Sequence, residues 1–193
     1  MNSSSGKATF AAMAAMLVAV ALFQNRSAQS SSATTSQVPA KPLLLEKNVG
    51  ERRIWREHPP GDFILKVSPK NNGSQQLVMG TEDMAPGDEF QTHKHLGQDE
   101  LCISKKEPFT FIWENRNAIS ARRRNCIHPE NTWVDIKNAG TERVSVVFVF
   151  SAPGFENYMR CDSVLPNEKV TPRSLEGQKE CSHQGHVIYK DTL

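Results

Sequence analysis

An eight-residue stretch, HKHLGQDE, runs from His93 to Glu100 and decides how the fold of this chain is interpreted. Residues i and i+2 of a β-strand project from the same face, so His93 and His95 are expected to share one face. Gly97 and Asp99 favour a tight turn into a second strand that begins at Glu100. Folded as a hairpin, the stretch brings two imidazole nitrogens and one carboxylate oxygen together. Such ligands suit a divalent first-row metal and leave coordination positions open.

Short apolar runs on both sides of this stretch predict further β-strands. Residues 63–67 (FILKV) and 76–79 (QLVM) are bounded by turn-forming residues, with the strong turn signal Asn72-Gly73 between them. Residues 109–113 (FTFIW) place three aromatic rings on one face, either as core or as the wall of an apolar pocket. The run at 144–150 (VSVVFVF) is typical of a strand buried on both faces. Closure of these strands into a barrel removes exposed sheet edges.

The spacing of Gly87, the two histidines and Glu100 resembles the first signature of the cupin superfamily. The segment PENTWVDIKN, at 129–138, resembles the second signature, which reads Pro-x-Gly-x-x-His-x-x-x-Asn. The resemblance covers roughly residues 60–152 and implies a metal held by three ligands from the first signature and one His from the second. The predicted fold class is therefore mainly β: a cupin-type antiparallel β-barrel (double-stranded β-helix or jelly roll) with a short C-terminal helical extension.

The chain departs from the cupin pattern at several positions. Val134 stands where the second signature has its His, so the fourth protein ligand is expected to be missing. His128 is a candidate replacement, but we interpret it as a structural histidine. Glu107 and Arg123 replace glycines of the pattern. Asn131 replaces another, and because Asn tolerates a left-handed backbone best among non-glycine residues, it is expected to preserve the turn.

The predicted site is a divalent metal ion bound by His93, His95 and Glu100. These ligand types admit Fe, Mn, Ni, Cu and Zn alike. The favoured function is a metal-binding barrel protein with a pocket for a small-molecule ligand and no assigned activity or catalytic residue. One alternative is a mononuclear non-haem iron oxygenase, whose Fe(II) is held by two His and one carboxylate. A second alternative is a metal-free structural or ligand-binding barrel, because cupin folds host many functions.

The N-terminal sequence predicts export. An uncharged apolar run from Ala8 to Phe23 follows Lys7 and precedes small residues, as in a cleaved signal peptide, and favours a secreted or periplasmic protein. The run is shorter than the ~20 residues of a spanning helix, so stable membrane anchoring is not expected. An uncleaved N-terminal anchor is the alternative. The net charge of +2 gives no reason to expect a nucleic-acid partner.

Four cysteines in the mature chain fit two disulfides in an oxidising compartment. Four cysteines allow three connectivities, and the sequence does not choose among them. We favour Cys102–Cys126 and Cys161–Cys181. The alternative is a free buried thiol, above all at Cys102, which shares the strand face of Glu100.

The domain prediction divides the chain into four parts: a signal peptide at 1–33, a flexible linker and N-terminal arm at 34–58, the cupin β-barrel at 59–155, and a C-terminal extension with a short helix at 156–193. In cupins such an arm often pairs with a second subunit, so the resemblance implies a homodimer. His183 and His186, in the expected C-terminal helix, are interpreted as surface residues.

Overall fold

The computed structural model describes residues 42–57, 61–104, 109–113, 119–121 and 125–190. The predicted signal peptide, residues 34–41 of the predicted linker, Glu107 and Arg123 lie outside the described residues. None of the helices in the described ranges is long and apolar enough to cross a membrane.

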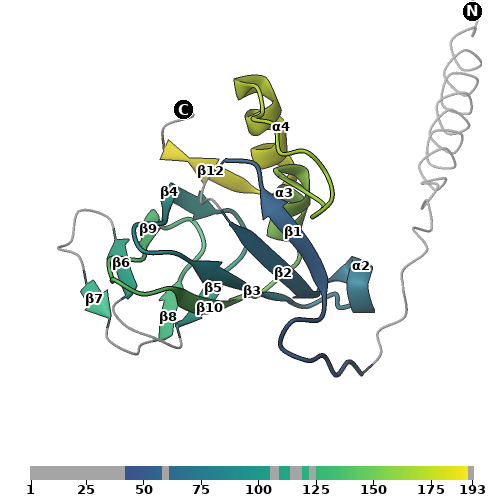
Figure 1. The fold of residues 1–193 in the computed structure, drawn as a ribbon, viewed down its shortest axis with the longest axis horizontal. Coiled ribbons are helices and arrows are strands. Elements are labelled where there is room, and N and C mark those ends of the chain that lie inside the picture. The colour runs from purple at the N-terminus through teal and green to yellow at the C-terminus, as the bar shows by residue number, and fades with distance from the viewer. Residues whose placement is uncertain (1–41, 58–60, 105–108, 114–118, 122–124, 191–193) are drawn as a thin grey trace, which may run out of the picture. The chain divides into compact units, whose positions relative to one another are not determined.

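The described strands form two antiparallel sheets (Figure 1). The larger sheet has the order β11-β1-β2-β3-β10-β5-β8, and the smaller has the order β12-β4-β9-β6-β7. The strands of the larger sheet are β1 (Glu51–Trp55), β2 (Asp62–Val67), β3 (Val78–Met84), β5 (Glu100–Ser104), β8 (Asn125–His128), β10 (Val144–Phe150) and β11 (Ser163–Val164). Those of the smaller sheet are β4 (Glu89–His95), β6 (Phe109–Trp113), β7 (Ile119–Ala121), β9 (Val134–Lys137) and β12 (Val187–Tyr189). The helices are α2 (Pro69–Asn72), α3 (Phe155–Cys161) and α4 (Leu175–Gln184).

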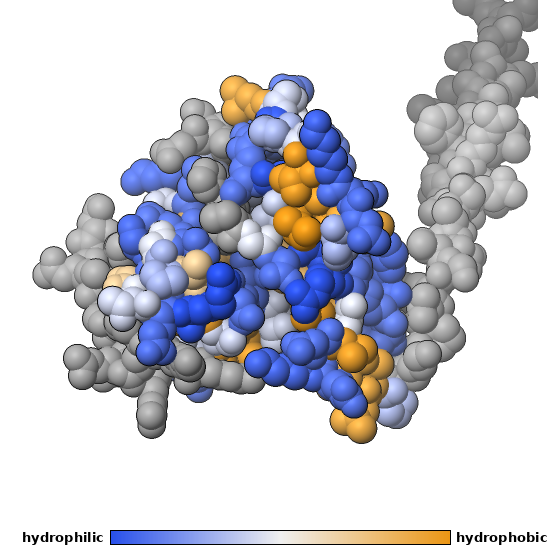
Figure 2. All heavy atoms as spheres, viewed as in Figure 1, coloured by the Kyte–Doolittle hydropathy of each residue, from blue (hydrophilic) through white to orange (hydrophobic). Residues whose placement is uncertain are grey.

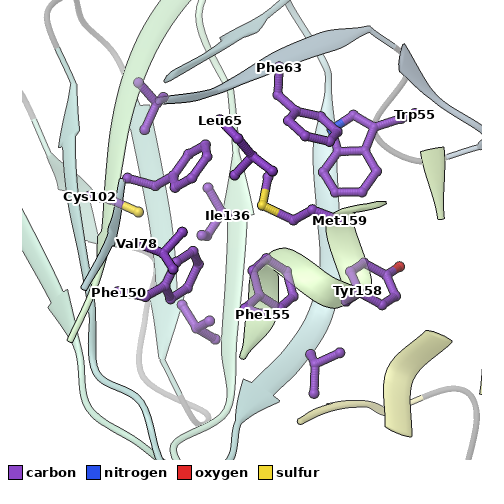
Figure 3. Packing of buried hydrophobic residues seen from close by; sticks show 14 of the residues in the cluster. Trp55, Phe63, Leu65, Val78, Cys102, Ile136, Phe150, Phe155, Tyr158 and Met159 are labelled. Atoms are coloured by element: carbon purple, nitrogen blue, oxygen red, sulfur yellow. The ribbon is translucent and has the colours of Figure 1, made fainter. Parts of the chain in front are cut away.

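The fold is mainly β, as predicted, and its two antiparallel sheets are consistent with a jelly roll. Between the described strands no ladder joins one sheet to the other, so they form two sheets and not one hydrogen-bonded cylinder. Side chains from both sheets meet in one hydrophobic cluster, which includes Phe63 and Phe148 from the larger sheet and Ile136 from the smaller. Helix α3 adds Phe155 and Met159 to this core (Figure 3). Figure 2 shows mostly polar side chains over the described surface of one face.

Two local predictions differ from the structure. The run at 144–150 was expected to be buried on both faces, but β10 alternates buried with half-buried residues, because only one face of its sheet covers the core. The Asn72-Gly73 pair does not make a hairpin turn. It ends α2, where Gly73 takes a left-handed conformation with φ of 76° and caps the helix.

Chain segments on both sides of the predicted barrel join the sheets. Strand β1, from the predicted N-terminal arm, pairs with β2 and β11. Strand β12, from the predicted C-terminal extension, pairs with β4. The predicted C-terminal helix is present as α4, which Ser174 caps by accepting a hydrogen bond from the amide of Gly177.

The cysteines follow one of the two predicted pairings. Cys161 in α3 and Cys181 in α4 form a disulfide, which confirms that prediction and links the two helices. The predicted Cys102–Cys126 disulfide is wrong: both thiols are free and buried. The two residues nevertheless lie directly opposite each other on β5 and β8.

Candidate metal centre

The stretch from His93 to Glu100 does not fold as the predicted hairpin. His93 and His95 end β4 in the smaller sheet, whereas Glu100 begins β5 in the larger sheet. Between them Gly97 takes a left-handed conformation with φ of 79°, which a glycine adopts without strain. The turn therefore carries the chain from one sheet to the other, and the side chains of His93, His95 and Glu100 come together there.

Four side chains converge at this position. His93, His95, Glu100 and His128, here called the histidine–glutamate group, each offer one ligand atom, and these atoms lie within 4.8 Å of one another. All four residues are buried. One carboxylate oxygen of Glu100 lies 3.3 Å from His95 Nε2 and 3.5 Å from His128 Nδ1. The group is compact enough for one ion to contact all of its members.

Backbone carbonyl groups orient two of the imidazoles. The Nδ1–H of His93 donates to the carbonyl oxygen of Gln91 at 2.8 Å, and the Nε2–H of His128 donates to that of Thr132 at 2.5 Å. A carbonyl oxygen can only accept, so these contacts fix the tautomer of each ring. The opposite nitrogens, His93 Nε2 and His128 Nδ1, are left as lone-pair donors. Metal-binding histidines typically have such an outer hydrogen bond.

His95 lacks hydrogen bonds within the described part of the chain. Its side chain is fully buried, and neither ring nitrogen has a hydrogen-bond partner there. The 3.3 Å contact with Glu100 is a close approach without hydrogen-bond geometry. A buried polar group without a partner costs free energy, and in native proteins it calls for an explanation such as an ion. The donor atoms of the histidine–glutamate group thus fit a metal ion.

The electrostatics of the group favour the protonation states that bind metals. Burial, with His95 nearby, lowers the pKa of His93 to about 3, and burial likewise lowers the pKa of His95. Burial alone would raise the pKa of Glu100. The neighbouring His128 and His95 outweigh burial and hold the pKa of this carboxyl group well below its usual range. At neutral pH His93 and His95 are therefore neutral imidazoles and Glu100 is a carboxylate, as metal binding requires.

From the sequence, His128 is a candidate replacement ligand interpreted as a structural histidine, but the structure places it in the group. The cross-strand register of β5 and β8 sets Glu100 opposite His128, and the buried residues of β8 alternate from Cys126 to His128. That alternation, with period two, was the available sequence signal. Val134 is also fully buried and lies opposite His93 on β9. Asn131 has φ of 60°, which confirms that it preserves the turn.

A mostly apolar pocket adjoins the group. His93 and Glu100 form part of its lining, and aromatic rings such as Phe90, Phe148 and Phe155 form much of the rest. The pocket thus offers a small molecule both an apolar wall and access to the histidine–glutamate group. The side chains of residues 109–113, predicted as a possible wall, lie outside the described side chains. His183 and His186 are exposed.

Comparison with known proteins gives only remote likenesses. No protein-family model matches the chain, and no curated protein matches it. A predicted oxalate decarboxylase from Thermotoga maritima aligns with a TM-score of 0.47 and 16% identity, over 58% of this chain and 100% of that one. A sugar phosphate isomerase from a cupin superfamily, from Silicibacter pomeroyi, aligns with a TM-score of 0.45 and 14% identity, over 57% and 76% of the two chains.

A structure of DMSP lyases aligns with a TM-score of 0.42 and 17% identity. The alignment spans 49% of this chain and 49% of the chain in that structure. With similarity this low, we assign no activity from these proteins. The fold and site define a mainly β protein of antiparallel sheets, with a buried group of three histidines and one glutamate able to bind a divalent metal.

Proposed function

We propose that this chain is a cupin-type protein that binds one divalent transition metal through His93, His95, Glu100 and His128 and takes a small molecule in the adjoining pocket. The convergence of four buried donor groups, with His95 Nε2 left without a hydrogen bond beside Glu100, carries the proposal. The two signatures in the sequence support the cupin assignment. Imidazole and carboxylate ligands suit several first-row metals, so the metal remains one of Fe, Mn, Ni, Cu or Zn.

The residues around the ion would bind and orient, while the pocket would exclude water. His93 and His128 are held by backbone carbonyl groups, so their free nitrogens need no reorientation before binding. The apolar side chains of the pocket lower the local dielectric, which strengthens interactions between the metal and a bound oxygen group. When bound, the metal supplies a Lewis acid that polarises such an oxygen.

We also infer that the protein is exported. The Cys161–Cys181 disulfide supports this inference, because disulfides persist mainly in oxidising compartments. The predicted signal peptide supports it from the sequence. The homodimer implied by the cupin resemblance stays a prediction, as does the absence of a nucleic-acid partner.

Metal titration of the full chain tests the proposed function. Calorimetry with Zn²⁺ and Mn²⁺ should show one ion per chain, and elemental analysis of protein from its own host should identify the native metal. Loss of outer hydrogen-bond partners alone typically weakens metal binding by about 10–100-fold. Loss of a ligand in His93→Ala or His128→Ala should therefore weaken it at least that much. The matched control is His183→Ala, which removes an exposed histidine. Equal affinities in His128→Ala and His183→Ala would contradict the four-residue site.

An iron oxygenase is the second candidate function. The observation that favours it is the apolar pocket beside the histidine–glutamate group, which can shield reactive chemistry from water. Iron in the native protein together with oxygen uptake would support this candidate. Native metal without turnover would support a binding protein. A native protein without metal, whose stability is unchanged by added metal, would point to the metal-free barrel.

A further inference from the structure

Glu82 is a buried carboxyl group in the wall of the apolar pocket. It lies on β3 with 6% of its surface exposed and lines the same pocket as His93 and Glu100. The indole Nε1–H of Trp55 donates to Glu82 Oε1 at 2.8 Å. Burial raises the pKa of Glu82 to about 8, and the nearby charged groups that act with burial, chiefly Glu100, are acidic. At neutral pH the pocket wall therefore carries a neutral carboxylic acid.

Glu82 and the histidine–glutamate group line the same pocket from different strands. Glu82 is opposite Val146 on β10, and Val146 is opposite Ser104 on β5, four residues along the strand from Glu100. Strand β10 therefore lies between the strands that carry Glu82 and Glu100. Phe148 and Phe150 on this intervening strand line the pocket. The pocket thus has polar groups on two strands and apolar side chains on the strand between them.

Figure 3 shows Trp55 and Cys102 among the packed side chains of the core. Trp55, which bonds Glu82, lies across the view from Cys102, with Ile136 and Met159 between them. Cys102 marks the metal end, because its Sγ lies 3.2 Å from Glu100 Oε1. The apolar side chains in the middle belong to the pocket lining.

Accepting from the buried indole N–H of Trp55 uses only one oxygen of the carboxyl group at position 82. A buried polar group costs free energy unless its hydrogen bonds are satisfied, and an apolar side chain of similar size avoids that cost. A carboxylic acid has an O–H to donate besides the oxygen that accepts from Trp55. In a pocket wall, these properties suit recognition of a ligand better than stabilisation of the core.

We propose that Glu82, positioned by Trp55, determines which small molecule the pocket binds by hydrogen bonding to the ligand end that lies away from the metal. The inference rests on the proposed function, since the other end of the ligand would bind the metal. The ligand class is a small molecule with an apolar body, an acidic oxygen group at the metal end and a neutral hydroxyl or carbonyl group at the Glu82 end. A second anionic end is disfavoured, because it would be buried beside a carboxyl group without a cation.

Matched pairs of short carboxylates test this proposal on the full chain loaded with Zn²⁺. The two members of a pair have the same number of heavy atoms, but one ends in a hydroxyl group and the other in a methyl group, as in 5-hydroxypentanoate and hexanoate. The pairs cover chains of about four to eight heavy atoms. One well-made hydrogen bond corresponds to a preference of about tenfold for the hydroxyl end in the wild type. Calorimetry measures both affinities.

Three variants separate recognition from folding. Glu82→Leu should abolish or reverse the hydroxyl preference while keeping the Zn²⁺ affinity of the wild type. Glu82→Gln keeps a neutral hydrogen-bonding group and should retain the preference. Asp83→Asn, at the exposed neighbour, is the charge control and should behave as the wild type. An unchanged preference in Glu82→Leu overturns the proposal, and so does a wild type that binds none of the probes.

A metal-independent measurement keeps this test distinct from that of the metal site. In infrared difference spectra, the carbonyl-stretch band of protonated Glu82 is identified by its absence in Glu82→Leu. This band should shift when the hydroxyl probe is added at high concentration, with or without Zn²⁺, and should not respond to the methyl probe. Failure of Zn²⁺ to bind refutes the proposed function, whereas failure of the band to shift refutes the role of Glu82.

Discussion

Replacing Glu82 with glutamine should change how the free energy of unfolding depends on pH. In the folded protein, burial raises the pKa of Glu82 to about 8, whereas its ordinary value is 4.5. Between these two pH values the unfolded chain loses the proton and the folded protein keeps it, so the stability of the wild type falls as the pH rises. The difference between the two pKa values, at 1.36 kcal/mol for each pH unit, limits this loss of stability to about 5 kcal/mol.

A buried histidine acts in the opposite direction over part of this range. The pKa of His93 is lowered to about 3 in the folded state from its ordinary 6.5. The unfolded state therefore binds more protons between these values, and this contribution to stability increases as the pH rises to 6.5. Above pH 6.5 the contribution of His93 is constant, and the fall caused by Glu82 should be seen directly.

Urea unfolding of the metal-free full chain at intervals from pH 5 to 8 measures these free energies. The effect of His93 is common to the wild type and Glu82→Gln, so the difference between them isolates Glu82. Glu82→Gln should become more stable relative to the wild type with each step in pH, towards that limit near pH 8. Asp83→Asn should run parallel to the wild type. Parallel curves for the wild type and Glu82→Gln would refute the reasoning, because they would mean that Glu82 titrates normally.

Four further substitutions, in three experiments, test other contacts. Cys161→Ala removes the disulfide across a sequence separation of 20 and should lower the free energy of unfolding by about 3 kcal/mol, measured by urea denaturation. Trp55→Phe keeps an aromatic ring but leaves Glu82 Oε1 without its donor, which should cost about 1–3 kcal/mol in thermal denaturation. His128→Ala should weaken Zn²⁺ binding in calorimetry, and adding Val134→His should recover most of the affinity. No recovery would show that position 134 does not face the ion.

The sequence predicted the class of fold because local patterns dominate there. The alternation of apolar residues and the turn residues of this chain favour short antiparallel strands, and most of the predicted strands are present. It did not predict which strands are neighbours. The stretch from His93 to Glu100 contains a good turn, but the same turn serves a hairpin or a crossing between two sheets. Only long-range pairing with β9 and β10 distinguishes the two, and local sequence does not encode it.

The predicted ligands had a comparable limit. His93, His95 and Glu100 lie close together in the sequence, so their proximity follows from strand periodicity and one turn. His128 joins them through the pairing of β5 with β8, which sets it opposite Glu100 across 28 positions of sequence. For the free thiols the sequence predicted a bond that the structure does not have. Cys102 and Cys126 are correctly placed as partners, but opposite positions in a ladder need not bring two sulfur atoms into disulfide geometry.

The contrast between Val134 and His128 explains how the site can depart from the cupin pattern and still offer four ligands. Val134 lies on β9 beside His93, in the smaller sheet, whereas His128 lies on β8 beside Glu100, in the larger sheet. Both positions are buried, so a histidine at either one can reach the space between the sheets. A ligand lost from one sheet is therefore replaceable from the other without moving the remaining three. The inner faces of the two sheets meet at this point, and in this chain β8 of the larger sheet supplies the third imidazole.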